Sequence, residues 1–237
     1  MQFTIDSAIF DSFPDAGFGA AAVKGIDNLT ADPDIEAFLR HASLEAGLLL
    51  KLKPIGNDKS ILAYREALAK IGAAEVVSPA ERTIRRFEEG LLAASESGLQ
   101  FVPGQMTGLE GAMALPRENP VMDLVHGAEL QFRMPVLAFD VGKDEAPLSL
   151  TRTASGDIAF VLGGDISVPS FLGEQTEKGR VSGETRNLLL VIPCFGVNRR
   201  KAMSLRNELA RRLKDSFGRT SEAAWLSGEE REFVSKI

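Results

Sequence analysis

The 237-residue chain contains a single cysteine, Cys194, and only two histidines. One cysteine cannot form an intramolecular disulfide, which is typical of proteins in a reducing cytoplasm, and so few sulfur and imidazole ligands argue against a metal site such as structural zinc. No stretch approaches the roughly 20 apolar residues that a membrane-spanning helix requires. Residues 1–6 lack the basic start and apolar run of a secretion signal, so we expect a cytoplasmic location and no membrane partner.

Positive charge is also scarce overall: the chain has 27 basic and 33 acidic residues, so its net charge is −6. This balance argues against a protein that coats nucleic acid through bulk charge, and a hydrophobic content of 44% excludes disorder. The basic residues nevertheless cluster. The segment 199–219 holds eight of them against two acidic residues, a net charge of +6 that leaves −12 for the rest. Such a segment can follow phosphates, and a solvated helix face explains it equally well.

Caps and apolar spacing predict five helices. Three of them start with a capping side chain followed by proline at the first helical position, which is a typical helix start. The predicted helices begin at 32–33, cover 61–71, begin at the capping box 78–81, begin at 119–120, and cover the basic segment 199–217. Gly72 and Gly90 are the expected ends of the second and third.

Apolar runs predict strands at 18–23, 136–140, 148–153, 157–162 and 188–192, and residues 10–14 are also strand-like. The last run is apolar throughout, as in a central strand buried on both faces. Helices and strands cluster rather than alternate, so we expect an α+β fold with mixed β-layers covered by helices. No linker interrupts the chain, which predicts a single compact domain over 1–237, and the glycine-rich stretch 98–113 predicts a loop.

Motifs for a nucleotide cofactor are incomplete. Residues 17–22 match the loose form of the dinucleotide fingerprint. That motif needs a strand before it and a helix after it, whereas Pro14 interrupts the lead-in and Gly25 ends the segment early. Small residues in a tightly packed strand explain the match better, and we expect no cofactor.

His126 is the more informative of the two histidines. It follows Asp123 by three residues in a predicted helix, so both side chains project from nearly the same face. Two interpretations remain open: a histidine bonded to a nearby backbone carbonyl, or a member of a binding site.

An ordered series of short motifs extends along nearly the whole chain. It includes 13–14, 25–28, 64–67 and 78–86, and it is densest at 119–123, 134–140, 150–157 and 183–190. Each motif alone is unspecific. The ordered set resembles the tRNA-binding and editing region, the third and fourth modules, of the phenylalanyl-tRNA synthetase β subunit and its free-standing relatives. The remainder of the synthetase is absent, so we expect an independent version of that region.

The resemblance implies hydrolysis of the ester that joins a wrong amino acid to the 3′ end of a tRNA. In the synthetase this amino acid is tyrosine in place of phenylalanine. An activated ester needs no covalent nucleophile when a water is held near its carbonyl and backbone N–H groups stabilise the oxyanion. The catalytic residues are therefore left unassigned, and the implied partner is a mischarged aminoacyl-tRNA.

The resemblance also implies a glutamate that recognises the wrong amino acid. Spacing from the motif at 183–190 points to Glu177, whereas a preceding glycine points to Glu174, and both stay open. His126 stands where the family has an asparagine of this pocket. Leu137 replaces a family histidine, so specificity for tyrosine is not implied.

Arginines are the expected tRNA ligands. Arg85 and Arg86, from a small basic cluster that also contains Arg82, would hold phosphate or the terminal adenosine together with Arg152. Besides a deacylase that acts in trans, two functions remain open: a tRNA or amino-acid binding module without turnover, and a small-molecule binder or metabolic enzyme of the same fold. Leu137 and the acidic net charge favour the binding module.

Overall fold

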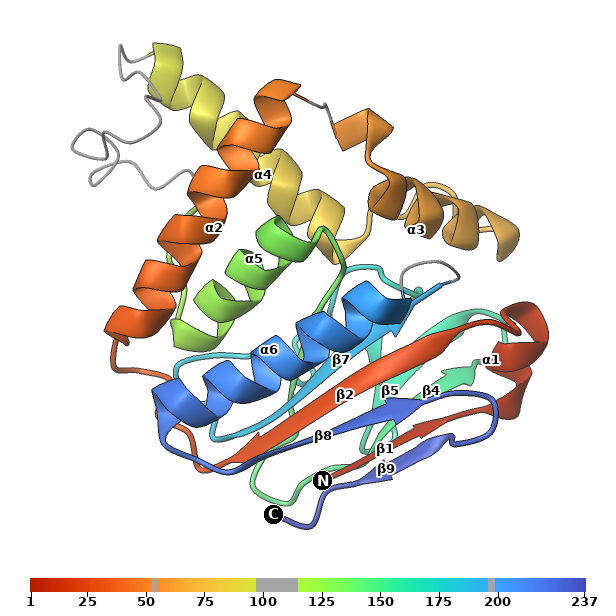
Figure 1. Cartoon of the computed structure of the whole chain (residues 1–237). Coiled ribbons are helices and arrows are strands. Elements are labelled where there is room, and N and C mark those ends of the chain that lie inside the picture. The colour runs from red at the N-terminus through yellow and green to blue at the C-terminus, as the bar shows by residue number, and fades with distance from the viewer. Residues whose placement is uncertain (53–54, 97–114, 196–198) are drawn as a thin grey trace.

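The structure is a computed structural model, and it describes residues 1–52, 55–96, 115–195 and 199–237. These residues form two β-sheets with helices packed on one of them, which confirms the predicted α+β class (Figure 1). The predicted loop at 98–113 lies outside the described residues.

The first sheet has the strand order β6-β5-β4-β1-β9. It is mixed, because β1 is parallel to β4 while the other neighbours are antiparallel. Its strands are β1 (Gln2–Ile5), β4 (Leu148–Arg152), β5 (Ile158–Leu162), β6 (Asp165–Val168) and β9 (Glu232–Val234). The sheet thereby joins strands from the two ends of the sequence.

The second sheet is antiparallel and has the order β3-β7-β2-β8. Its strands are β2 (Gly17–Lys24), β3 (Leu137–Asp140), β7 (Asn187–Cys194) and β8 (Ser221–Leu226). The sheets share one apolar core, in which the rings of Phe139 on β3 and Phe160 on β5 lie 5.3 Å apart. The central strand predicted at 188–192 is confirmed, since β7 lies between β3 and β2 and is buried along nearly its whole length.

Small residues allow β2 to be covered on both faces. One face packs into the core between the sheets, and the other lies under α6 (Arg199–Phe217), as Figure 1 shows. A Cβ at Gly19 would lie 3.3 Å from the Cβ of Arg206, so the helix approaches the strand closely. This confirms tight packing, rather than a nucleotide loop, as the reason for the glycines and alanines.

The remaining helices are α1 (Ser7–Ser12), α2 (Pro33–Leu52), α3 (Lys59–Lys70), α4 (Pro79–Glu96) and α5 (Pro120–Phe132), with a 3-10 turn at Ile55–Asn57. The predicted caps are present. Asp32 accepts hydrogen bonds from the N–H groups of Asp34 and Ile35, and Asn119 accepts one from Met122. Figure 1 shows α5 lying between α2 and α4. No helix in the described part of the chain is long and apolar enough to cross a membrane.

Two local predictions are wrong. Gly90 does not end α4, which continues to Glu96, because the residues after Gly90 are good helix formers and a helix tolerates one internal glycine. The segment 10–12 is helical instead of extended, because Asp6 caps α1 through the N–H of Ala8.

Candidate functional site

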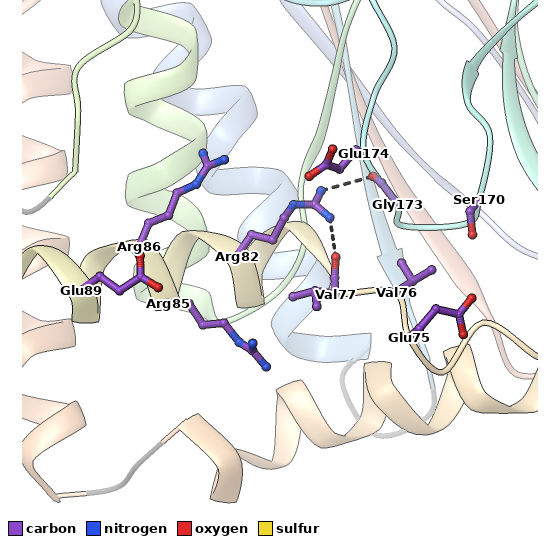
Figure 2. A pocket seen from close by; sticks show the side chains of 10 residues that line it. All are labelled: Glu75, Val76, Val77, Arg82, Arg85, Arg86, Glu89, Ser170, Gly173 and Glu174. Atoms are coloured by element: carbon purple, nitrogen blue, oxygen red, sulfur yellow. Dashed lines mark hydrogen bonds between the residues drawn. The ribbon is translucent and has the colours of Figure 1, made fainter.

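A cavity of about 550 Å³ lies where the N-terminal part of α4 faces the loop that follows β6 (Figure 2). Its volume falls within the range of small-molecule sites. Three arginines and three glutamates line it: Arg82, Arg85, Arg86, Glu75, Glu89 and Glu174. The structure thus brings together three residues proposed from the sequence, namely Arg85, Arg86 and Glu174. Glu177, His126 and Arg152 are not among the lining residues.

The arginines reach one side of α4 because of their spacing. Positions 82, 85, 86 and 89 follow the i, i+3, i+4, i+7 pattern that places side chains on one helical face. Ser78 starts the helix, and its hydroxyl accepts a hydrogen bond from the N–H of Glu81 at 3.4 Å. Only this half of the predicted capping box forms, because the carboxylate of Glu81 turns to other partners.

Those partners are two arginines. Arg65 on α3 donates to Glu81 through Nε at 3.1 Å and Nη2 at 2.7 Å, and Arg85 donates to the same carboxylate. The side chain of Glu81 is only 3% exposed. Burial raises the pKa of Glu81, but the hydrogen bonds from both arginines outweigh burial and hold its pKa below the ordinary value. The carboxylate therefore fixes the cavity-lining Arg85 to α3.

Arg82 connects α4 to the loop across the cavity. Its guanidinium donates to the carbonyl of Val77 and to those of Leu172, at 3.4 Å, and Gly173, at 3.2 Å (Figure 2). From the sequence, Arg82 is only a member of the basic cluster and has no predicted role in the site. The missing information was the position of two carbonyls about 90 residues away in the sequence.

The two candidate glutamates differ in position. Glu174 follows Gly173 directly, lines the cavity and lies beside the guanidinium of Arg82 (Figure 2). Glu177 is 85% exposed and forms an ion pair with Arg180 at 2.7 Å. Of the two, only Glu174 is placed to contact a ligand in this cavity.

Arg86 is exposed and forms no hydrogen bond or ion pair with another residue that the structure describes. Its charge acts on Glu129 and His126 of the neighbouring α5. Glu129 is fully buried and accepts hydrogen bonds from the hydroxyl of Thr83 at 2.5 Å and the N–H of Val136 at 3.0 Å. Burial raises the pKa of Glu129 to about 7. Because Arg82 is held by backbone carbonyls and Arg85 by Glu81, Arg86 is the cavity arginine with the most freedom to bind an anion.

His126 lies within α5 and is 6% exposed. Burial lowers its pKa to about 4, against the opposing effect of Asp123, so the imidazole is neutral near pH 7. Asp123 itself is held by Arg117 at 2.5 Å. The Nδ1 atom of His126 has no hydrogen-bond partner in the described structure. Among the described residues, His126 neither donates a hydrogen bond to a backbone carbonyl nor lines the cavity, so the structure gives it neither of the two predicted roles.

Arg152 lies at the hairpin between β4 and β5. It donates to the carbonyl of Gly156 at 2.9 Å and to the hydroxyl of Ser12. The bond to Ser12 ties the hairpin to α1, and Arg152 does not line the cavity that the arginines of α4 share.

The cavity offers charge rather than a nucleophile. Its lining residues include the hydroxyl of Ser170 but no histidine, cysteine or lysine. Across the described ranges, no group of three or more histidine, cysteine, aspartate or glutamate side chains is placed to hold a metal ion. What the lining residues can do is bind an anion through Arg85 and Arg86, and a cationic or hydrogen-bonding group through Glu174.

Neither a protein-family model nor a curated protein matches this chain.

Proposed function

We propose that the chain is a free-standing aminoacyl-tRNA deacylase that removes a wrong amino acid from tRNA in trans. The proposal joins the resemblance to the phenylalanyl-tRNA synthetase β editing region with one observation: Arg85, Arg86 and Glu174 line a single cavity of about 550 Å³. A cavity of this size can accept an amino acid together with part of the terminal adenosine.

The charges of the cavity suit the two ends of such a ligand. The aminoacyl group carries an ammonium, which the carboxylate of Glu174 can bind, whereas the RNA carries phosphates, which Arg86 and Arg85 can bind. The start of α4 lies beside the cavity, and the positive end of its dipole favours an anion or a developing oxyanion.

The reaction requires few groups from the protein. The oxygen of a bound water attacks the ester carbonyl, the bond to the ribose oxygen breaks, and the water proton passes to that oxygen. The products are a free amino acid and a tRNA with a free terminal hydroxyl. Binding and orienting the ester against water accounts for the acceleration, so a Ser-His pair is not required.

A binding module without turnover is the second candidate. It is favoured by the lining residues, which include no histidine, and by Leu137, which is buried in β3 where the family has a polar residue. This candidate predicts that the protein binds aminoacyl-tRNA but does not shorten its lifetime.

The deciding experiment incubates the protein with a panel of mischarged tRNAs and follows the loss of the aminoacyl ester. We expect one species to be lost rapidly, and Glu174→Gln to slow the reaction about tenfold or more, because a hydrogen bond to a charged group is worth about 1.5–3 kcal/mol. Glu177→Gln is the matched control and should act like the wild type. Binding without loss supports the second candidate. Absence of both binding and loss at low salt contradicts both.

A further inference from the structure

The exposed face of α6 carries positive charge that the described structure does not neutralise. Among its cations, Arg211 pairs with Glu208 and Asp215, and Arg212 pairs with Glu208. These two carboxylates are the only acidic residues of the helix. Arg199, Arg200, Arg206 and Lys214 thus remain without a carboxylate partner among the described residues.

Arg206 is a partly buried member of this group of cations. Its side chain is partly buried because the helix packs closely on Gly19 of β2. Among the described residues its guanidinium donates hydrogen bonds only to a neutral group, the side-chain oxygen of Asn207, at 3.1 and 2.7 Å. Burial lowers the pKa of Arg206, and no acidic neighbour opposes this effect. An anion bound beside Arg206 would supply the missing counter-charge.

The only tryptophan of the chain lies next to this charge. Trp225 is on β8, an edge strand of the second sheet, and is half-buried. The indole lies over Gly17, where any side chain would overlap it, and the guanidinium of Arg199 is 5.5 Å from the centre of its ring. A flat aromatic ring beside an arginine is the arrangement on which nucleobases stack.

We propose that this face of α6, together with Trp225, is a docking surface for RNA. Arg200, Arg206 and Lys214 would contact phosphates, while Arg199, whose guanidinium lies over the indole of Trp225, would stack on an unpaired base. The charge distribution supports a polyanion, because segment 199–219 carries +6 while the rest of the chain carries −12. A strong local field of this sign steers an anionic partner to one face. The indole favours RNA over an acidic peptide, which offers no base to stack.

This surface deepens the proposed function and rests on it for the identity of the RNA. The lining residues of the cavity at α4 belong to other segments, so the two sites share no residue. The cavity would bind the aminoacyl end, and α6 would hold the body of the tRNA.

The test measures binding of a labelled, uncharged tRNA transcript by fluorescence anisotropy at several salt concentrations, with Trp225 emission as an internal reporter. The double variant Arg200→Ala/Arg206→Ala should bind roughly 50-fold more weakly at 0.1 M salt. The negative slope of log K against log salt should become shallower by about 2. The matched control Lys143→Ala/Lys178→Ala removes two lysines from turns outside α6 and should bind as the wild type does. Trp225 emission should be quenched at the same tRNA concentrations that raise the anisotropy.

Three results would overturn the proposal: equal losses in the two double variants, binding without a change in Trp225 emission, or equal affinity for poly-L-glutamate. The two proposals can fail separately. Binding by α6 without hydrolysis by the wild type would contradict the deacylase alone, whereas hydrolysis by the wild type with unchanged tRNA binding in Arg200→Ala/Arg206→Ala would contradict the docking surface alone.

Discussion

His126 and Glu129 lie one turn apart on α5, both are buried, and their pKa values are displaced in opposite directions. Burial disfavours the charged form of each, so the histidine loses its proton more easily and the glutamate keeps its proton longer. Both groups are therefore neutral in the folded protein over part of the range between pH 4 and pH 7. The two titrations have opposite effects on stability, and each can be isolated by substitution.

Glu129→Gln should reduce the loss of stability that the wild type undergoes as the pH rises toward neutral. In the folded wild type the carboxyl keeps its proton up to a pKa of about 7, whereas in the unfolded chain it releases the proton near 4.5. The folded state thus binds more protons in this interval, and stability falls as the pH rises from 4.5 to 7, by about 3 kcal/mol at most. Urea denaturation at pH 5 and pH 8 measures this. The variant should lose less stability between the two than the wild type, and identical losses would contradict the assignment.

His126→Asn should make the stability of the folded protein less sensitive to acid. The folded imidazole takes up a proton only near a pKa of about 4, while the unfolded chain takes it up near 6.5. The unfolded state binds more protons between these values, so wild-type stability falls as the pH decreases from 6.5 to 4, again by about 3 kcal/mol at most. Denaturation at pH 4.5 and pH 7 tests this. We expect a shallower decline in the variant, and His41→Asn, at an exposed position, serves as the control.

Glu81→Gln should destabilise the protein more than Glu208→Gln. Each carboxylate bonds two arginines, but the side chain of Glu81 is 3% exposed and that of Glu208 is 26% exposed. Removing one partner from a buried cluster costs about 2–4 kcal/mol, whereas exposed pairs are worth about 1 kcal/mol or less. Thermal or urea unfolding of both variants gives the comparison. Equal losses would show that the cluster of Glu81 is fully screened by solvent.

The sequence predicts the elements whose signals are local. The starts of α2 and α5 follow from Asp32 and Asn119, and β7 follows from an uninterrupted apolar run. The strands β1 and β9 are short and carry no such signal. They exist because Gln2 pairs with Val234 and Phe3 with Phe233, contacts that no window of sequence contains.

The residues of the site likewise fall into those that the sequence predicts and those that it does not. Arg85 and Arg86 share a side of α4 through helical spacing, which the sequence displays. The choice between Glu174 and Glu177 depends on the path of an irregular loop. Arg82 bonds the carbonyls of that loop, and neither spacing nor residue type encodes such a contact.

Gly127→Ala should loosen the packing of α5 on α2. A Cβ at this position would lie 2.9 Å from the ring of Phe38 and 3.3 Å from the backbone of Leu39, so one helix would have to shift. Overpacking of this kind costs about 1–3 kcal/mol. Gly56→Ala is the control, because a Cβ there meets no atom within 4 Å. Unfolding free energies should fall for the first variant and change little for the second.

Arg82→Met should release the loop across the cavity while retaining an unbranched side chain of similar length. The guanidinium bonds the carbonyls of Val77, Leu172 and Gly173, and a methionine of similar length donates to none of them. Hydrogen exchange measured by mass spectrometry should therefore accelerate in peptides covering 170–176, while peptides of the central β7 stay protected. Arg86→Met, which removes an exposed arginine of the same helix, should leave the loop unchanged. If deacylation or ligand binding at this cavity depends on a fixed Glu174, Arg82→Met should weaken it, and Arg82→Lys should restore only part of the loss because an ammonium lacks the planar reach of the guanidinium.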